Sequence, residues 1–586
     1  MQDYLLPVTV AIPSAVALIL FLVRGSGLRK MLVTFFAALL LVIGMALAAL
    51  LPSAAKGLTL GITPLVSGFG WLAAFANLAV LILAMAAGRR RHNSKMILLA
   101  LFQAIPYMIF RIFFTEPQLI RNTAANVVSL AFISLLYLGT GGVLLISRWF
   151  MKGSAMRKFR GPEYMLLILS LSALAFLAAD FSWIYFCFLL ISLLMFEMMI
   201  SDNRSRSRED LSREGEHLPE VQANRPAECS LRELTHAAVQ KDERWFNMTL
   251  LAGLVFMTGM ILAQFAKRSS MLFDFTDPLI MFNRTSFEYA IAFFCAAFFM
   301  YASSFPFQKA VLDLDRLTSA AGAFIALCFS FGISAYLLVR FALLIYGSTL
   351  GALLSVLGAL CFLGASLLSL GNRDPWRRTV FHSLAAFSLL VCSISTGRHG
   401  ILRIFVFLGI QMLTMVVIRF FMQTGITSKS LRPAGRLLRL LPAGAAVASR
   451  FLLYPHLADY PVIILLLIPG LALGVADFCL ELAEVLQDVP FLTPVTPPDR
   501  PAESGGFEHR GGRGLRFLPH IGGDARDLEG PARLFAGAGD RLYSVEYRHG
   551  SLKDIFDRIL RKGRMEIFFQ ICAALAFLVL FGVVTS

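Results

Sequence analysis

Long apolar segments, separated by short polar ones, dominate the chain. The apolar segments run for about 17–25 residues, the length that a helix needs to cross a hydrocarbon core of about 30 Å. Lipid offers backbone amides no hydrogen-bond partner, so such segments are predicted to be helices. The predicted spans are 4–23, 31–51, 60–87, 96–114, 126–146, 163–179, 183–200, 246–266, 288–304, 318–340, 345–370, 380–396, 402–422, 461–482 and 565–584, with 442–456 as a weaker further candidate because Arg450 interrupts it.

The composition agrees with this pattern. The chain is 57% hydrophobic and 15% charged, whereas a typical soluble domain is about 45–50% apolar and about 25% charged. A mean hydropathy of +0.72 is too high for a soluble core of this length. The sequence therefore predicts an all-α, polytopic integral membrane helix bundle of about 15–16 transmembrane helices.

Basic residues give the chain an orientation in the membrane. The formal net charge is +16, and the lysines and arginines cluster in the loops at 24–30, 89–95 and 148–160, whereas the loops between them hold only Lys56 and Arg121. Such alternation is the positive-inside pattern, and it predicts a bacterial inner membrane protein with its N-terminus outside. A nucleic-acid-binding surface is the alternative source of the charge, but the alternation favours membrane lipid as the partner and no nucleic acid.

Polar interruptions divide the chain into segments. We expect a first transmembrane pair at 1–51, a first part of the bundle at 52–200, a mobile cytoplasmic hydrophilic loop at 201–245 and a second part of the bundle at 246–486. A Pro/Gly-rich linker at 487–550 follows, and it is cytoplasmic only if 442–456 crosses the membrane. Segment 551–564 has the spacing of a basic amphipathic helix, which lies either at the interface or on the protein's own loops, and 565–586 forms a C-terminal transmembrane helix.

The stretch from 303 to 341 carries turn-forming and polar residues at fixed places between two spans. It resembles the antiporter-like membrane subunits shared by respiratory complex I, Mrp-type cation/proton antiporters and membrane-bound energy-converting hydrogenases. These subunits read approximately K-S-A-Q-F-P-F-H-T-W-L-P-D and then, at the end of a histidine-bearing helix, Y-L-L-V-R-F. The residues that match in register are Phe305, Pro306, Phe307, Asp313 and the run 336–341, which includes Arg340.

Other segments resemble the same family. Asp180 matches an A-D-N turn before the family's fifth helix, and Asp374 matches an N-D-I-K-R turn. Segment 470–482 resembles G-L-P-P-F-S-G-F-F-S-K-E-L without its two prolines. The resemblance spans 126–482, so the first two spans look like an N-terminal addition to an antiporter-like fold.

The resemblance implies a proton relay of glutamate, lysine and histidine at membrane depth. Carried over residue by residue, the glutamate position is Leu190, the first lysine is Tyr301, the helix histidine is Ala326 and the second lysine falls near Met415. A relay needs ionisable groups whose charged and neutral forms are close in energy. With these positions replaced, the usual relay is predicted to be absent.

Three carboxylates are candidates for a relocated ion or proton path. Glu197 lies two helical turns after Leu190, although a carboxylate there also suits the membrane interface. Asp477 and Glu481 lie one turn apart and could share a proton or bind a cation, but near a helix end both are expected to face water. His382, at the start of a span, is expected to serve as a cap or loop residue and not as a metal ligand.

Motifs for enzyme chemistry are absent from the sequence. The eight cysteines stand singly without a C-x-x-C motif, so neither a metal site nor any other cofactor is predicted. No Walker-type glycine loop and no recognisable Ser/His/Asp arrangement appears. We expect no active site on this chain, and whether it belongs to a proton-translocating oxidoreductase stays open.

The leading hypothesis is a divergent antiporter-like subunit of a multi-subunit, energy-converting membrane complex. Its expected partners are sister membrane subunits and protons or sodium ions, and its expected role is structural or coupling instead of pumping. The alternatives are a stand-alone secondary transporter that uses another site, such as Asp477 and Glu481, and a membrane scaffold that recruits a cytoplasmic partner through 201–245.

Overall fold

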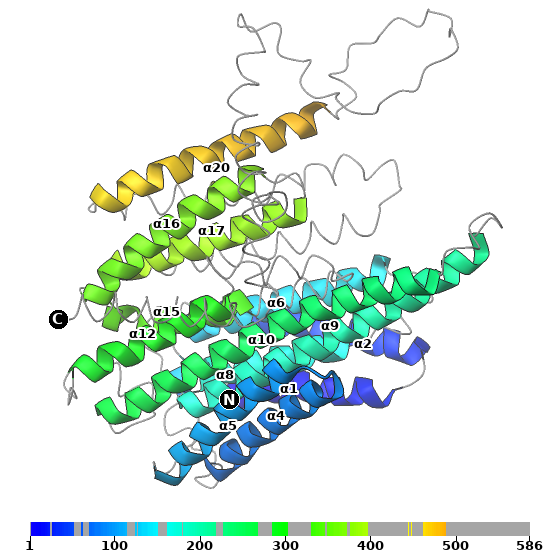
Figure 1. The fold of residues 1–586 in the computed structure, drawn as a ribbon, viewed down its shortest axis with the longest axis horizontal. Helices are drawn as coiled ribbons and strands as arrows, with labels where there is room; N and C mark the ends of the chain where they lie inside the picture. The colour runs from blue at the N-terminus through cyan, green and yellow to red at the C-terminus, as the bar shows by residue number, and fades with distance from the viewer. Residues whose placement is uncertain are drawn as a thin grey trace, which may run out of the picture.

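The computed structural model is a bundle of long helices (Figure 1). It describes residues 2–23, 26–51, 60–61, 70–113, 124–125, 127–150, 161–178, 180–217, 227–267, 284–302, 330–345, 348–371, 375–396, 444, 447 and 461–487. Within these ranges the fold is all-α except for one two-residue strand pair, which confirms the predicted fold class.

The first half of the described chain forms seven helices. They are α1 (Gln2–Leu22), α2 (Ser26–Ala49), α4 (Gly70–Arg90), α5 (Ser94–Phe113), α6 (Val127–Phe150), α8 (Gly161–Leu177) and α9 (Phe181–His217). The strands β1 (Leu60–Gly61) and β2 (Ala124–Ala125) pair antiparallel, with Leu60 opposite Ala125. The second half contributes α10 (Ala227–Lys267), α12 (Arg284–Tyr301), α15 (Ser330–Ile345), α16 (Thr349–Gly371), α17 (Pro375–Thr396) and α20 (Pro461–Gln487).

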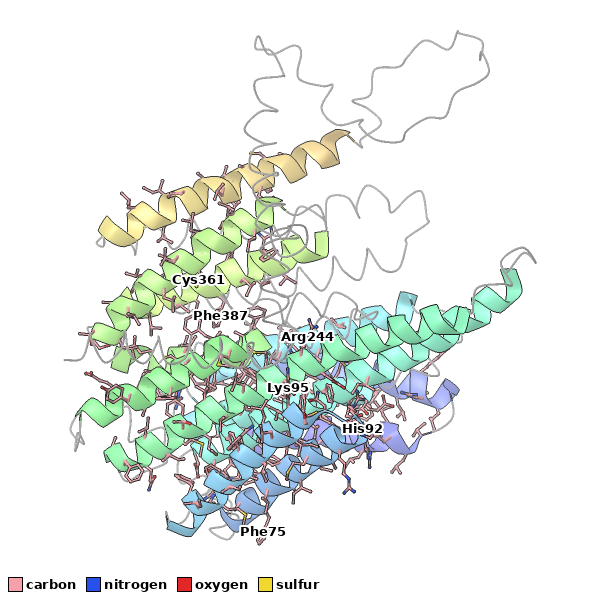
Figure 2. All side chains as sticks on the ribbon, in the orientation of Figure 1. Phe75, His92, Lys95, Arg244, Cys361 and Phe387 are labelled. Atoms are coloured by element: carbon pink, nitrogen blue, oxygen red, sulfur yellow. The ribbon has the colours of Figure 1, made fainter. Side chains whose placement is uncertain are left out.

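Side chains on the outside of the bundle are apolar, as lipid contact requires. Five described helical stretches are long and apolar enough to cross a membrane: Gly27–Ala49, Ser94–Arg111, Phe181–Ile200, Glu243–Ala266 and Thr349–Ser369. Seven shorter apolar stretches accompany them. Phe75 is 66% exposed and points away from the bundle at its edge (Figure 2). Exposed aromatic and aliphatic side chains of this size are stable only in an apolar solvent, so the chain is a multi-pass membrane protein.

Aromatic side chains fill the interior between helices. Phe387 of α17 is fully buried (Figure 2), and its ring lies 5.8 Å from that of Phe299 on α12 and 5.9 Å from that of Phe331 on α15. Helix α17 packs against α16, and α16 packs in turn against α20. These contacts place α16, α17 and α20 together as one group on the side of α15.

The first helix pair is packed into the same bundle. Helix α1 lies against α8, and α2 lies against α6. Between α2 and α8, Arg29 forms a 2.5 Å ion pair with Glu163, a residue that is 1% exposed. A buried carboxylate is stable only when it is paired, so this ion pair joins the first pair of helices to the rest.

The segment predicted as a hydrophilic loop, 201–245, is mostly helical in its described part. Helix α9 continues to His217, and α10 already begins at Ala227. Residues 201–217 and 227–245 are thus helical, and the expectation that this segment is a mobile cytoplasmic connection between two spans stays a prediction.

Most predicted spans coincide with helices, with one clear difference in a boundary. The span predicted at 60–87 begins as strand β1 at Leu60, and its helix α4 begins only at Gly70. Spans 402–422 and 565–584, nearly all of 442–456, and segments 488–550 and 551–564 lie outside the described residues, so the count of about 15–16 helices stays a prediction.

Candidate functional site

Two of the positions that correspond to relay residues lie in the described bundle, on α9 and α12. Tyr301 ends α12 and is fully buried. Its ring centroid lies 3.7 Å from that of Phe188 on α9, two residues before Leu190. Leu190 is partly buried against the same core. Both positions therefore contribute hydrophobic packing between α9 and α12.

The surroundings of Tyr301 are a continuous stack of phenylalanine rings. Phe294 lies at its centre, with ring centroids 4.6 Å from Phe181, 4.9 Å from Phe256 and 5.5 Å from Phe341. These rings come from α9, α10, α12 and α15. A charged group among these rings would lose its hydration without gaining a counter-charge from them, so this part of the interior favours neutral side chains.

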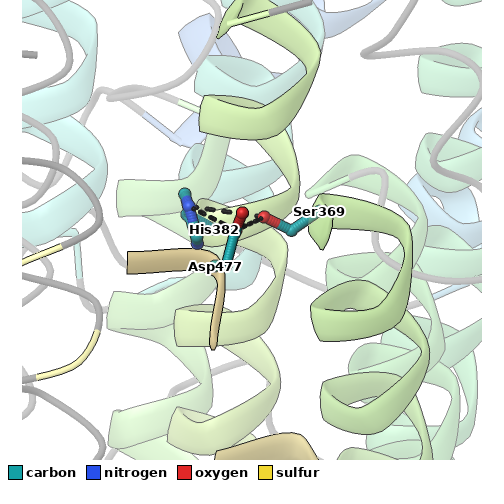
Figure 3. Close-up of polar contacts among 3 residues, drawn as sticks. All are labelled: Ser369, His382 and Asp477. Atoms are coloured by element: carbon teal, nitrogen blue, oxygen red, sulfur yellow. Dashed lines mark hydrogen bonds and ion pairs between the residues drawn. The ribbon is translucent and has the colours of Figure 1, made fainter. Parts of the chain in front are cut away.

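Asp477 meets two polar side chains at the junction of α16, α17 and α20. Figure 3 shows the three side chains pointing toward one another. Ser369 of α16 donates a hydrogen bond to Asp477 Oδ2, and His382 Nε2 of α17 lies 3.2 Å from the same oxygen. Ser369 Oγ and His382 Nε2 are 3.3 Å apart. The three groups thus converge on a single carboxylate oxygen.

The burial of this cluster corrects two sequence-based expectations. Asp477 is 0% exposed and His382 is 2% exposed, so neither faces water. His382 lies two turns inside α17, which begins at Pro375, and is therefore no cap. The sequence shows His382 and Asp477 as isolated polar residues 95 positions apart, and no local signal could have paired them.

Asp477 lies on the face of α20 that packs against α16. Buried positions on α20 recur as Leu467, Gly470, Gly474 and Asp477, the spacing of one helical face. At Gly470 the helices approach closely, because a Cβ atom there would lie 2.4 Å from Phe362 Cε1 on α16. Asp477 therefore belongs to the helix interface instead of the lipid face.

The other two candidate carboxylates do not join this cluster. Glu197 of α9 is exposed, and α9 packs against α4, α8 and α10 in a different part of the bundle. Glu481 continues α20 one turn beyond Asp477, but its side chain lies outside the described part of the chain. The proposed pairing of Asp477 with Glu481 stays a prediction, whereas that of Asp477 with His382 is observed.

Residues of the family-like motifs have visible structural roles. Asp180 caps the N-terminus of α9, since its Oδ1 accepts a 2.8 Å hydrogen bond from the backbone amide of Ser182. Tyr336 donates a 2.6 Å hydrogen bond to the carbonyl of Phe176 on α8, and the Arg340 guanidinium lies 6.0 Å from the Tyr336 ring. The remaining motif and relay positions lie outside the described residues, namely Phe305, Pro306, Phe307, Asp313, Ala326, Asp374 and Met415.

A second buried polar network joins α5 to its neighbours. Gln103 accepts a 2.8 Å hydrogen bond from the Tyr185 hydroxyl of α9 and donates one of 2.9 Å to the carbonyl of Leu250 on α10. Tyr107 accepts hydrogen bonds from Asn77 of α4 at 2.8 Å and from Arg111 at 3.1 Å. No sequence pattern marks this network, because its members are single polar residues inside apolar spans.

Within the described residues, no group of three or more histidine, cysteine, aspartate or glutamate side chains is arranged to hold a metal ion. Of the described cysteines, Cys187, Cys295, Cys361 and Cys392 are buried, and Cys479 on α20 is exposed.

Comparison with known proteins identifies the fold. No family model matches the sequence, and no curated protein matches it. The chain is similar to a chain of the membrane-bound sulfane sulfur reductase, an archaeal respiratory membrane complex, with a TM-score of 0.55 and 14% identity over 81% of this chain and 69% of that one. This likeness shows a shared fold.

Two further solved structures are similar at lower scores. A chain of respiratory complex I from Thermus thermophilus has a TM-score of 0.46 and 17% identity, over 71% of this chain and 90% of that one. A chain of the Mrp complex from Dietzia sp. DQ12-45-1b has a TM-score of 0.42 and 13% identity, over 77% and 79% respectively. The likeness to the reductase chain, the one of these three with a TM-score above 0.5, confirms the predicted antiporter-like fold.

Proposed function

We propose that this chain, which has the antiporter-like fold, is a divergent membrane subunit of a multi-subunit energy-converting complex of the complex I, Mrp or hydrogenase type. The observation that carries the proposal is the shared fold with a chain of a respiratory membrane complex over 81% of this chain. Sister membrane subunits are its proposed partners, and lipid surrounds the remaining apolar face.

The proposed role is structural or coupling, and the interior of the first half supports it. Tyr301 and Leu190, which correspond to the family's lysine and glutamate, pack among phenylalanine rings. An ionised group at this depth costs about 3 kcal/mol or more to bury, and neither side chain is ionised at neutral pH. Electron transfer would then take place on partner subunits. This chain would transmit conformational changes that start in those subunits through its own packed helices.

Purification from native membranes in mild detergent tests the assignment to a complex. An affinity tag on this chain should bring down further membrane subunits together with a redox or antiporter subunit, in fixed stoichiometry. A chain that purifies alone and supports ion flux in liposomes would instead be a stand-alone transporter. Recovery with a single soluble protein bound to the 201–245 segment would indicate a scaffold.

Glu197 offers a test of relay loss inside such a complex. This carboxylate is exposed at the end of a buried stretch and contacts none of the three residues around Asp477. Glu197→Gln should therefore leave proton-linked activity of the purified complex within about twofold of wild type, since a relay member normally contributes far more than this. A collapse of activity in this variant, with the complex still assembled, would contradict the proposed loss of the relay.

A further inference from the structure

We propose that the turn between α4 and α5 binds the headgroup of an anionic phospholipid, whose acyl chains lie along the exposed apolar faces of the same two helices. The residues that bind the headgroup are Arg89, Arg90 and Lys95. This helical hairpin precedes the stretch 126–482 that resembles the antiporter-like family. The inference is independent of the function proposed above.

The turn has a fixed backbone conformation. The Asn93 amide donates a 3.0 Å hydrogen bond to the Gly88 carbonyl, which closes the end of α4. His92 has a φ of 54°, the left-handed conformation that commonly ends helices. Asn93 Oδ1 accepts a 3.2 Å hydrogen bond from the backbone amide of Met96 and so caps α5. The chain therefore reverses over residues 91–93, which brings the last turn of α4 beside the first turn of α5.

Two side chains of the turn hold it against α9 and α10. The Arg91 guanidinium lies 4.9 Å from the ring centroid of Phe196 on α9. Asn93 Nδ2 donates a 2.9 Å hydrogen bond to Glu243 Oε2 on α10. These two contacts attach the turn to the rest of the bundle, so its other side chains extend from a defined position.

The other basic side chains of the turn are accessible. Arg89 and Arg90, in the last turn of α4, are exposed, and Lys95 in the first turn of α5 is partly exposed. His92 and Lys95 mark this turn in Figure 2. Between residues 88 and 95 the sequence has three arginines, one lysine and no acidic residue. A basic cluster of this kind at the end of membrane helices attracts anionic headgroups.

Acidic groups on the neighbouring helices do not cancel this charge. Glu243 reaches the turn, and Arg91 interacts with it electrostatically, so Glu243 is offset within the contact. Helices α9 and α10 continue beyond this contact, and over 200–210 and 235–245 they carry as many lysines and arginines as aspartates and glutamates. Counted in full, these two segments add no net charge, and the turn keeps its positive charge.

An exposed apolar face runs along each helix toward the basic residues. On α4 the exposed positions Phe75, Ala79, Ile82, Ala86 and Arg89 follow one another at spacings of three and four, which is one face of a helix. The exposed apolar residues of α5 in the half nearer the turn are Leu98, Leu101, Phe102 and Ile105. These faces are long enough for acyl chains, because seven residues of helix already extend for about 10 Å.

The combination of a basic turn and adjoining apolar faces favours a phospholipid over other ligands. A soluble anion would use the basic turn alone, and a partner helix would use the apolar faces alone. A phospholipid matches both, because its negative charge lies at the boundary between its polar and apolar parts. The positive-inside pattern predicts that this turn lies on the cytoplasmic side, where the leaflet carries anionic lipids.

Native mass spectrometry of the purified protein, with every subunit that co-purifies, tests the proposal. The protein in detergent is titrated with phosphatidylglycerol and, separately, with phosphatidylcholine that has the same acyl chains. Wild type should bind the anionic lipid more tightly by about tenfold or more, since each basic side chain near a headgroup contributes about fivefold in affinity. Combining Arg89→Gln, Arg90→Gln and Lys95→Gln should remove most of this preference.

Matched variants separate the site from the general charge of the protein. Lys30→Gln removes a positive charge at the start of α2, which packs against α6, and should leave the lipid preference unchanged. Arg89→Lys combined with Arg90→Lys keeps the charge and should retain the preference. Far-ultraviolet circular dichroism verifies that each variant keeps its helix content.

Photocrosslinking locates the bound lipid. Phosphatidylglycerol with a diazirine group in its acyl chain should crosslink to peptides from 75–90 or 94–105 in wild type, and less in the triple glutamine variant. The matching phosphatidylcholine probe should crosslink to these peptides less than the anionic one.

Three results would contradict the proposal. The first is equal affinity of wild type for the two lipids, and the second is a loss of preference in the Lys30 variant as large as in the triple glutamine variant. The third is the absence of crosslinks to the hairpin when partner subunits are bound, because a protein would then cover this face. A preference for phosphatidylglycerol that depends on the three basic residues, with crosslinks on α4 or α5, would support it.

Discussion

Tyr301 and Asp477 show how the surroundings of one side chain decide its chemistry. Tyr301 is enclosed by rings, with Phe188 at a centroid distance of 3.7 Å, so its site accepts an apolar or neutral group. Asp477 is buried to the same degree, but it has a histidine and a serine within hydrogen-bonding range. Burial alone therefore does not decide whether a side chain serves in apolar packing or in hydrogen bonding, whereas the neighbouring polar atoms do.

Substitution at Tyr301 tests whether the aromatic surroundings of this side chain exclude a charged group. Tyr301→Lys, which restores the family's residue type, should lower the free energy of unfolding by about 2–3 kcal/mol, because the ammonium group gains no counter-charge among the rings. Tyr301→Phe, the matched control, keeps the ring contact and should change stability by less than about 1 kcal/mol. Thermal unfolding in detergent measures both. If the lysine variant were as stable as wild type, polar groups would have to reach this position, which would contradict the apolar surroundings described for Tyr301.

Gln103 tests the value of a buried amide between helices. Gln103→Leu removes the acceptor for Tyr185 and the donor to the Leu250 carbonyl, and it should cost about 1–2 kcal/mol of stability. Gln264→Leu on α10 is the control, since the Gln264 side-chain oxygen has no hydrogen-bond partner in the described part of the chain. Unfolding in mild denaturant compares the two variants. If the Gln264 variant were the less stable, the network around Gln103 would contribute nothing to the fold.

At the scale of elements, α20 is positioned by its small residues. Gly470 lets the α20 backbone approach α16, and this approach brings Asp477 within reach of Ser369 and His382. Close backbone contact through glycine is typical of helix pairs in membranes. The polar cluster is thus a consequence of helix packing, and a change far from any polar atom should disrupt it.

Gly470→Leu is the corresponding test. The added side chain would overlap Phe362 and should move α20 away from α16, at a cost of about 1–3 kcal/mol. A spin label on Cys479, with the other cysteines replaced, should become more mobile. Ala472→Leu, on the exposed face of α20, is the matched control and should leave the label unchanged. If the spin-label spectra of the two variants were identical, α20 would be held in place by contacts other than the one between Gly470 and Phe362.

At the scale of the whole molecule, α9 and α10 extend well beyond the other helices (Figure 1). They are 37 and 41 residues long, which corresponds to about 55 and 60 Å against a hydrocarbon core of about 30 Å. We therefore predict that their polar ends project from the membrane as a helical hairpin. The positive-inside pattern predicts that this hairpin lies on the cytoplasmic side.

The native Cys229, at the start of α10, makes the orientation testable. A membrane-impermeant maleimide should label Cys229 in inside-out vesicles and not in intact cells, in a chain whose other cysteines are replaced. A cysteine introduced as Lys56→Cys, in a loop predicted to lie outside, should show the opposite pattern. Labelling of Cys229 from the outside would invert the predicted topology.

Much of the architecture follows from the sequence because hydrophobic length is a local property. The helices α1, α5, α8 and α12 begin and end within four residues of their predicted spans, and the motif at 336–341 predicts the antiporter-like fold. Asp477 is likewise recognisable as a candidate, because a carboxylate within an apolar span is unusual. Locality also limits prediction at 201–217, where high charge alone did not reveal that α9 continues to His217.

Only the tertiary structure could decide which polar residues meet. Ser369 and His382 are 13 residues apart and Asp477 is 95 residues further along, and their contact depends on the glycine face of α20 against α16. Helical periodicity assigns a residue to a face but not to a neighbour, because the order in which helices pack is set by interactions across the whole bundle. The sequence determined that this protein crosses the membrane many times and carries a carboxylate within it, whereas the packing of three helices decided that this carboxylate has a histidine as its partner.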